Sequence, residues 1–146
     1  MQDDDLPSPD HRRPPGMDDT TVAAVGKISE AFETIERARG HLYELHQLTG
    51  HADLALDDAV ELLHKAGHDA LAKRVETELI GRNVIEGRWT FQLVEEYDEG
   101  YYAAFRSLEA TARNELMGGR RHIFEAEMKE RRRTHGRRYH EARPAP

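Results

Sequence analysis

Between residues 89 and 117, apolar side chains recur at steps of three and four, and this spacing constrains the fold more than any other feature of the chain. The members of the stripe are Val94, Tyr97, Tyr101, Ala104, Phe105, Leu108, Ala112 and Leu116. A helical period places them on one side of an α-helix, and the opposite side receives Glu95, Glu99, Arg106 and Arg113. A helix with one apolar stripe needs a partner surface, so we expect other helices to cover it.

Three further segments have the same helical period and can supply that surface. They span residues 20–49, 54–81 and 120–133. Asp18 and Asp19 provide a capping oxygen and negative charge where the first segment begins. Residues 50–52 are expected to form a turn after it. The second segment changes the phase of its stripe at Gly67, which predicts a kink or a short break there. The pair Gly118–Gly119 is expected to end the segment that begins at residue 89.

These four segments predict an all-α fold, namely a small four-helix bundle with up-down-up-down connections. The bundle domain is expected to cover residues 18–134. Residues 1–17 contain four prolines among acids and arginines, and residues 135–146 have no apolar stripe. Segments without apolar surface cannot offset the entropy cost of ordering, so both ends are expected to be disordered tails.

Composition limits the classes of function that the chain can serve. Hydrophobic residues make up 38% of the sequence and charged residues 34%, so a core has to come from narrow helical stripes. The chain has no cysteine, which excludes disulfides, thiolate zinc sites and cysteine nucleophiles. No apolar run is long enough for a membrane span, and the acidic start lacks the pattern of a secretory signal. We therefore expect a soluble, cytoplasmic protein that does not contact membranes.

Histidines and carboxylates are expected to gather at one end of such a bundle, because its first and third connections lie at the same end. The candidate metal ligands are His46, Glu61, His64, Glu115 and Glu127. Imidazole and carboxylate groups are the ligands that iron, manganese and zinc accept from helical bundles. The sequence thus offers a metal-binding hypothesis in which His46 points inward, on the same stripe as Arg39.

A structural interpretation competes with the metal site. Glu61 and His64 have the Glu-x-x-His spacing of carboxylate-bridged di-metal bundles, but that motif has to occur twice and is present once. The chain has nine histidines, so pairs at helical spacing arise by chance. His46 would then be a hydrogen-bonded core residue. The carboxylates at positions 95–99 are interpreted as a solvated face, with only Asp98 at the border of the stripe, and no catalytic residue is assigned.

Charge is distributed unevenly along the chain, whose formal net charge is -7. From Arg120 onward, nine Arg or Lys stand against four Asp or Glu, whereas the preceding residues hold twelve against twenty-four. The basic end could contact nucleic acid weakly and without sequence specificity, through phosphates. We expect it instead to lie against acidic surface of the same chain or of another copy, since the acidic body would repel a polyanion.

These observations favour a helical bundle that acts by binding another protein or itself, for example as a homodimer. The alternative is a metal-binding bundle that holds iron, manganese or zinc and acts as an oxidoreductase or a hydrolase. No cofactor is assigned beyond that alternative.

Overall fold

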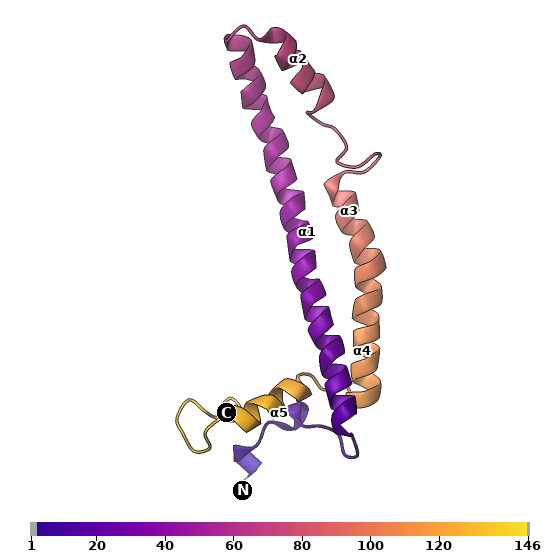
Figure 1. The fold of residues 1–146 in the computed structure, drawn as a ribbon, viewed down its shortest axis with the longest axis vertical. Helices are drawn as coiled ribbons and strands as arrows, with labels where there is room; N and C mark the ends of the chain where they lie inside the picture. Colours follow the sequence, from indigo (N-terminus) through magenta and orange to yellow (C-terminus); the bar gives the residue numbers. More distant parts are fainter. Residues whose placement is uncertain (1–2, 146) are drawn as a thin grey trace. The chain divides into compact units, whose positions relative to one another are not determined.

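The computed structural model describes residues 3–145, and its regular structure is helical apart from an isolated bridge between Ile85 and Arg88. The elements are the short 3-10 turns η1 (Asp3–Asp5) and η2 (Pro9–His11), the helices α1 (Asp19–Lys65), α2 (Asp69–Glu78) and α3 (Thr90–Tyr97), the π-helical turn η3 (Asp98–Tyr102), and the helices α4 (Ala103–Met117) and α5 (Ile123–Arg132) (Figure 1). The predicted all-α class, a small helical bundle, is confirmed. Within residues 3–145, no helix combines the length and the apolar character that crossing a membrane requires.

The chain divides into two compact units, which we describe separately. Unit 1 comprises residues 1–34 and 104–146, and unit 2 comprises residues 35–103. Unit 1 therefore contains the beginning of α1, nearly all of α4, and α5. Unit 2 contains the remainder of α1, followed by α2, α3 and η3.

Helix α1 begins where the sequence predicts. The backbone N–H of Thr21 donates to Oδ1 of Asp18 at 2.7 Å, so Asp18 caps the first turn. The side-chain and backbone hydrogen bonds from Thr21 hold the pKa of Asp18 below its usual value. An ionised cap also interacts favourably with the positive end of the helix dipole.

The predicted turn at residues 50–52 is wrong, because α1 continues through Gly50 for 47 residues in all. A single glycine costs a helix about 1 kcal/mol, and the strong helix formers after residue 51 outweigh that cost. The helix ends instead at Lys65, two residues before Gly67, which has a φ of 84°. The N–H of His68 bonds to Leu63 O and the N–H of Gly67 bonds to His64 O, the two bonds of a Schellman motif. The break predicted at Gly67 is thus confirmed, and in unit 2 both α2 and α3 run antiparallel to α1 (Figure 1).

The stripe predicted for residues 89–117 is correct only in part. Val94 is buried and Phe105 and Ala112 are half-buried, but Tyr101, Leu108 and Leu116 are exposed. The side chains that turn inward are each one residue later in the sequence, namely Tyr102, Glu109 and Met117. The cause is η3, since a π-helical turn inserts one residue into the α-helical repeat and rotates everything after it by about 100°. The prediction assumed an uninterrupted α-helix.

The core of unit 1 is a small cluster. Val22, Val25, Met117 and Ile123 are buried against one another, and Met17 packs beside them. Helix α5 approaches α1 closely at Gly26, where an added Cβ would lie 2.9 Å from Cβ of Phe124. Only glycine permits that approach, so this contact sets how α5 packs on the beginning of α1.

Unit 2 has even less buried apolar surface. Among its described residues, Val60, Ala72 and Val94 are the buried hydrophobic ones. Its large exposed apolar side chains are far more numerous: Tyr43, Leu45, Leu48, Leu54, Leu62, Leu71, Leu79, Val84, Ile85, Trp89, Phe91 and Tyr101. Polar contacts and the remaining half-buried side chains must therefore hold unit 2 together.

Candidate functional site

The inner face of α1 repeats every seven residues, and we call it the seam. Within unit 1 it comprises Val22, Val25, Ser29 and Phe32, and within unit 2 it comprises Glu36, Arg39, Tyr43, His46, Asp53 and Val60. Each of these residues is buried or contacts a later segment of its own unit. A spacing of three and four is that of a coiled-coil a/d seam, but here most positions are polar.

The strongest polar contact of the seam joins α1 to η3 in unit 2. Arg39 donates from Nε to Oδ1 of Asp98 at 2.8 Å and from Nη2 to Oδ2 at 3.1 Å. The guanidinium lies over the rings of Tyr43 and Tyr102, at 5.1 and 4.6 Å from their centroids. Hydrogen bonding to Arg39 lowers the pKa of Asp98, and hydrogen bonding to Asp98 raises the pKa of Arg39. The pair therefore stays ionised across the physiological range.

Two further polar pairs lie on either side of this ion pair in unit 2. The hydroxyl of Tyr102 donates to Glu36 at 2.5 Å, and Nδ1 of His46 lies 2.7 Å from the hydroxyl of Thr90. Beyond them, Oδ1 of Asp53 accepts the backbone N–H of Gly81 at 3.0 Å. Each partner is matched to one position of α1, so sliding α3 and η3 along α1 would break several pairs together. These contacts specify register in the way that polar coiled-coil positions do.

The seam of unit 1 contains one buried charge. Glu109 is 8% exposed and accepts a hydrogen bond from Ser29 at 3.0 Å and one from Nε of Arg113 at 3.1 Å. The prediction that Arg113 lies in solvent opposite the stripe is wrong, because Arg113 also donates to Gly119 O at 3.0 Å. Next along the seam, the rings of Phe32 and Phe105 stack with centroids 6.1 Å apart. Within residues 3–145, every buried side-chain nitrogen and oxygen has a hydrogen-bond partner.

The structure does not bring His46 together with the candidate ligands Glu61 and His64. His46, Glu61 and His64 all lie on α1 in unit 2, and at about 1.5 Å per residue His46 is roughly 22 Å from Glu61 and 27 Å from His64 along the helix axis. The prediction that they meet depended on a turn at residues 50–52. Their contacts are structural: His46 bonds Thr90, Glu61 pairs with Lys65, and His64 bonds Asp69.

The remaining two candidates belong to unit 1. Glu115 is exposed on α4. Glu127 is half-buried on α5, and it accepts a hydrogen bond from the guanidinium of Arg13 at 2.7 Å. Glu127 therefore already has a cationic partner.

A different group in unit 1 has the composition of a metal site. Glu33 of α1, His122 at the start of α5 and Glu125 of α5 place one ligand atom each within 4.8 Å of one another. His122 has a left-handed backbone with a φ of 58°, and its ring lies 6.4 Å from that of His11. All three side chains of the group are exposed. It is the one such group among residues 3–145. The spacing of His122 and Glu125 is visible in the sequence, but nothing in the sequence pattern brings Glu33 to them.

The acidic start and the basic end of the chain meet in unit 1. Arg133, whose side chain is 7% exposed, donates to Asp5 at 3.0 Å and to Glu130 at 2.7 Å. Arg143 pairs with Asp4 at 2.6 Å. A pocket of about 400 Å³ lies among these segments. The expected disorder of residues 1–17 and 135–146 stays a prediction, which these contacts make testable.

The outward face of α1 carries a second heptad pattern, which sequence analysis missed. We call it the leucine–alanine stripe, and its members in unit 2 are Leu45, Leu48, Ala52, Ala55, Ala59 and Leu62. Leu45, Leu48 and Leu62 are 46%, 59% and 63% exposed. At 100° per residue, the centre of this stripe lies about 160° around α1 from the centre of the seam. In the sequence, the members of this stripe are spaced by strictly alternating steps of three and four residues. The pattern is weak as a hydrophobic stripe because three of its members are alanines.

No protein-family model matches the chain, and neither the curated proteins nor the solved structures include a significant match. Function has to be argued from the molecule itself.

Proposed function

We propose that this protein acts by protein–protein interaction, and that a second copy of the chain is its partner. The observation that carries the proposal is the leucine–alanine stripe, because three leucines at coiled-coil spacing stand exposed on a helix whose other side is already covered. Monomeric proteins rarely leave contiguous apolar surface of this kind in water. The deficit of buried apolar side chains in unit 2 supports the same conclusion.

The spacing of the stripe favours a helical partner. Heptad positions interdigitate with a helix that has the same spacing, and the chain itself supplies one. A closed dimer with two-fold symmetry uses the same patch on both copies, so one stripe is enough. The three alanines allow the two helix backbones to approach closely.

The mass of the protein in solution tests this function. Light scattering after size-exclusion chromatography should give the mass of a dimer for the native chain. Leu48→Glu and Leu62→Glu should give monomers with unchanged helical circular dichroism, since a carboxylate cannot leave water without compensation. Leu108→Glu is the control, because Leu108 is 69% exposed on α4 of unit 1 and lies outside the stripe. A native chain that is monomeric at every concentration would overturn the proposal.

Metal binding is proposed as a second function, on the separate observation of Glu33, His122 and Glu125. Zinc accepts imidazole and carboxylate ligands, and the three ligand atoms lie within 4.8 Å of one another, close to the spacing of ligand atoms around a tetrahedral zinc ion. Small rotations of the three exposed side chains would place their ligand atoms around one ion. Calorimetric titration of the full chain with Zn²⁺ should show one site that His122→Ala removes and that His135→Ala, in the basic end, leaves intact. Absence of stoichiometric binding would reject this function.

A further inference from the structure

The geometry points to an antiparallel dimer in which the leucine–alanine stripe of one copy packs on the same stripe of a second copy, with residue 45 facing residue 62. This inference rests on the proposed self-association and adds its orientation, register and charge pattern. The two-fold axis would pass between residues 53 and 54 of both helices.

The spacing of the stripe makes this register self-complementary. Its steps of three, four, three, four and three read the same in both directions. Reversal therefore places Leu45 opposite Leu62, Leu48 opposite Ala59, and Ala52 opposite Ala55. Side-chain volume then decreases in steps from leucine pairs at the ends to alanine pairs at the axis.

A parallel pair would distribute volume less evenly. Each residue would face its own counterpart, so Ala52, Ala55 and Ala59 would produce three successive alanine layers beside layers made only of leucine. Abrupt changes of side-chain volume between layers leave voids between the helices. The side chains that line a void lose van der Waals contacts. Packing therefore favours the antiparallel orientation.

Charge provides a second, independent argument for the same register. Along one edge of the stripe, exposed side chains recur every seven residues, namely Glu44, His51, Asp58 and Lys65. Antiparallel pairing brings Glu44 of one copy beside Lys65 of the other, and His51 beside Asp58. Each of these contacts occurs twice in a two-fold dimer, and in all four a carboxylate faces a lysine or a histidine.

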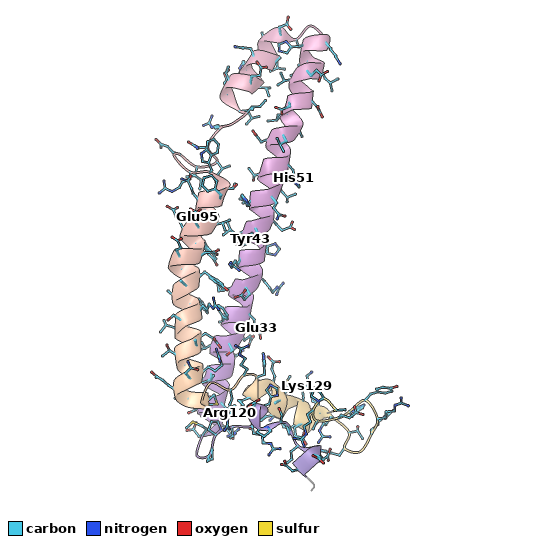
Figure 2. All side chains as sticks on the ribbon, turned by 180° about the vertical axis from the view of Figure 1, so that it is seen from behind. Glu33, Tyr43, His51, Glu95, Arg120 and Lys129 are labelled. Carbon is cyan, nitrogen blue, oxygen red and sulfur yellow. The ribbon has the colours of Figure 1, made fainter. Side chains whose placement is uncertain are left out.

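The parallel orientation lacks this complementarity. It would set Glu44, His51 and Asp58 beside Thr49, Leu56 and Leu63 of the other copy, which carry no charge. Lys65 forms an ion pair with Glu61 at 2.9 Å on its own helix, and both side chains are exposed. It therefore keeps the freedom to reach a second carboxylate. Figure 2 shows His51 on α1, away from the α3 residue Glu95.

Disulfide trapping tests the orientation, and the absence of native cysteine makes each introduced thiol a clean reporter. Leu45→Cys and Leu62→Cys are prepared separately, mixed, and oxidised mildly. A disulfide needs Cα atoms within about 7 Å, whereas the antiparallel register holds two copies of residue 45 about 26 Å apart along the axis. The mixture should form a cross-linked heterodimer, and neither variant should cross-link alone.

The outcomes separate this inference from the function on which it rests. Cross-linking of Leu45→Cys with itself, in a protein of dimeric mass, would establish a parallel dimer and overturn the inference while leaving self-association intact. A monomeric mass for the native chain would overturn both. A dimer in which no combination cross-links would place the interface elsewhere and reject the stripe.

A charge exchange tests the register without altering the stripe. Glu44→Lys and Lys65→Glu should each weaken dimerisation by roughly tenfold, because two attractive contacts become repulsive. The double variant should recover the native dissociation constant to within about twofold. Lys65→Glu loses the contact with Glu61 in the single and the double variant alike, so recovery can come only from the other copy. A double variant as weak as the singles would contradict the register.

Discussion

Arg39 and Asp98 lie 59 residues apart in the sequence and form a two-point ion pair that joins α1 to the π-helical turn of unit 2. The guanidinium is also covered by the rings of Tyr43 and Tyr102. A charged pair of this geometry is directional, so it contributes to the choice of one helix register as well as to stability. It stands where a hydrophobic layer would be expected in an ordinary helical seam.

Replacing Asp98 by asparagine should destabilise the protein at neutral pH and much less in acid. The folded pKa of Asp98 lies below its unfolded value, so its contribution is complete above about pH 4 and is lost as pH falls through the folded pKa. Asp98→Asn should cost about 1–3 kcal/mol at pH 7. Urea unfolding at a series of pH values from neutral to acid measures the difference.

Glu95→Gln provides the matched control for that experiment, because Glu95 is an exposed acid on neighbouring α3 (Figure 2). It should change the free energy of unfolding by less than about 0.5 kcal/mol at any pH. A destabilisation by Asp98→Asn that stayed constant down to the lowest pH would show that ionisation of Asp98 is not what stabilises the fold.

Deleting Gly100 should be tolerated. A π-helical turn is an α-helix with one extra residue, so removal of Gly100 restores the α-helical repeat and leaves Asp98, Tyr102 and Met117 facing inward. An added Cβ at Gly100 would meet nothing within 4 Å, so no contact depends on it. The free energy of unfolding should change by about 1 kcal/mol or less.

Deleting Thr111 is the comparison, since it also removes one exposed residue but from regular α4. Met117 would rotate by about 100° out of the core of unit 1, at a cost of about 2–5 kcal/mol. Chemical denaturation of both variants gives the two values. If the two deletions were equally damaging, η3 would not be the cause of the phase change.

Two glycine-to-alanine substitutions in α1 should have opposite effects on the free energy of unfolding. Gly50→Ala should stabilise by about 0.5–1 kcal/mol, because its surroundings are open and alanine favours the helix. Gly26→Ala should destabilise by about 1–3 kcal/mol, since its Cβ would press on Phe124. The melting temperatures of the two variants measure both effects. A Gly50→Ala variant less stable than the native chain would instead support a turn at residue 50.

Arg133→Ala should loosen both terminal segments of unit 1. Arg133 donates to Asp5, to Glu130 and to His140 O, so its loss removes the most buried contacts between the two segments and leaves the more exposed pair of Arg143 and Asp4. Hydrogen exchange should accelerate in residues 3–12 and 137–145 while α4 is unaffected. Arg132→Ala, at an exposed neighbouring position, should change little. Fast exchange of both segments in the native chain would instead support the prediction that they are disordered.

Sequence patterns predicted the helical class because a period of 3.6 is a local property. They could not anticipate η3, because a one-residue insertion leaves the composition of a helix unchanged and only shifts which side chains face inward. For the same reason Tyr101 and Leu108 were assigned to the core in place of Tyr102 and Glu109.

The error at Gly50 had larger consequences for the candidate site. A glycine followed by histidine and alanine resembles a turn, yet helix propensity on both sides carries α1 through it. The position of that turn decided which end of the bundle each histidine would occupy, and so the proposed ligand set depended on it. By contrast, the inward positions of Arg39 and His46 followed from helical phase alone and are confirmed by their partners Asp98 and Thr90.

The polar seam of α1 also bears on how the chain finds its native pairing during folding. A seam of identical leucines would fit its partner almost as well after a slip of one heptad, and the chain could become trapped there. Because Glu36, Arg39, His46 and Asp53 are distributed along the seam of unit 2, a slipped pairing would leave several charges or hydrogen-bond donors without their partners. Misaligned intermediates should therefore be short-lived, and folding should proceed without the slow phase that escape from such a trap would add.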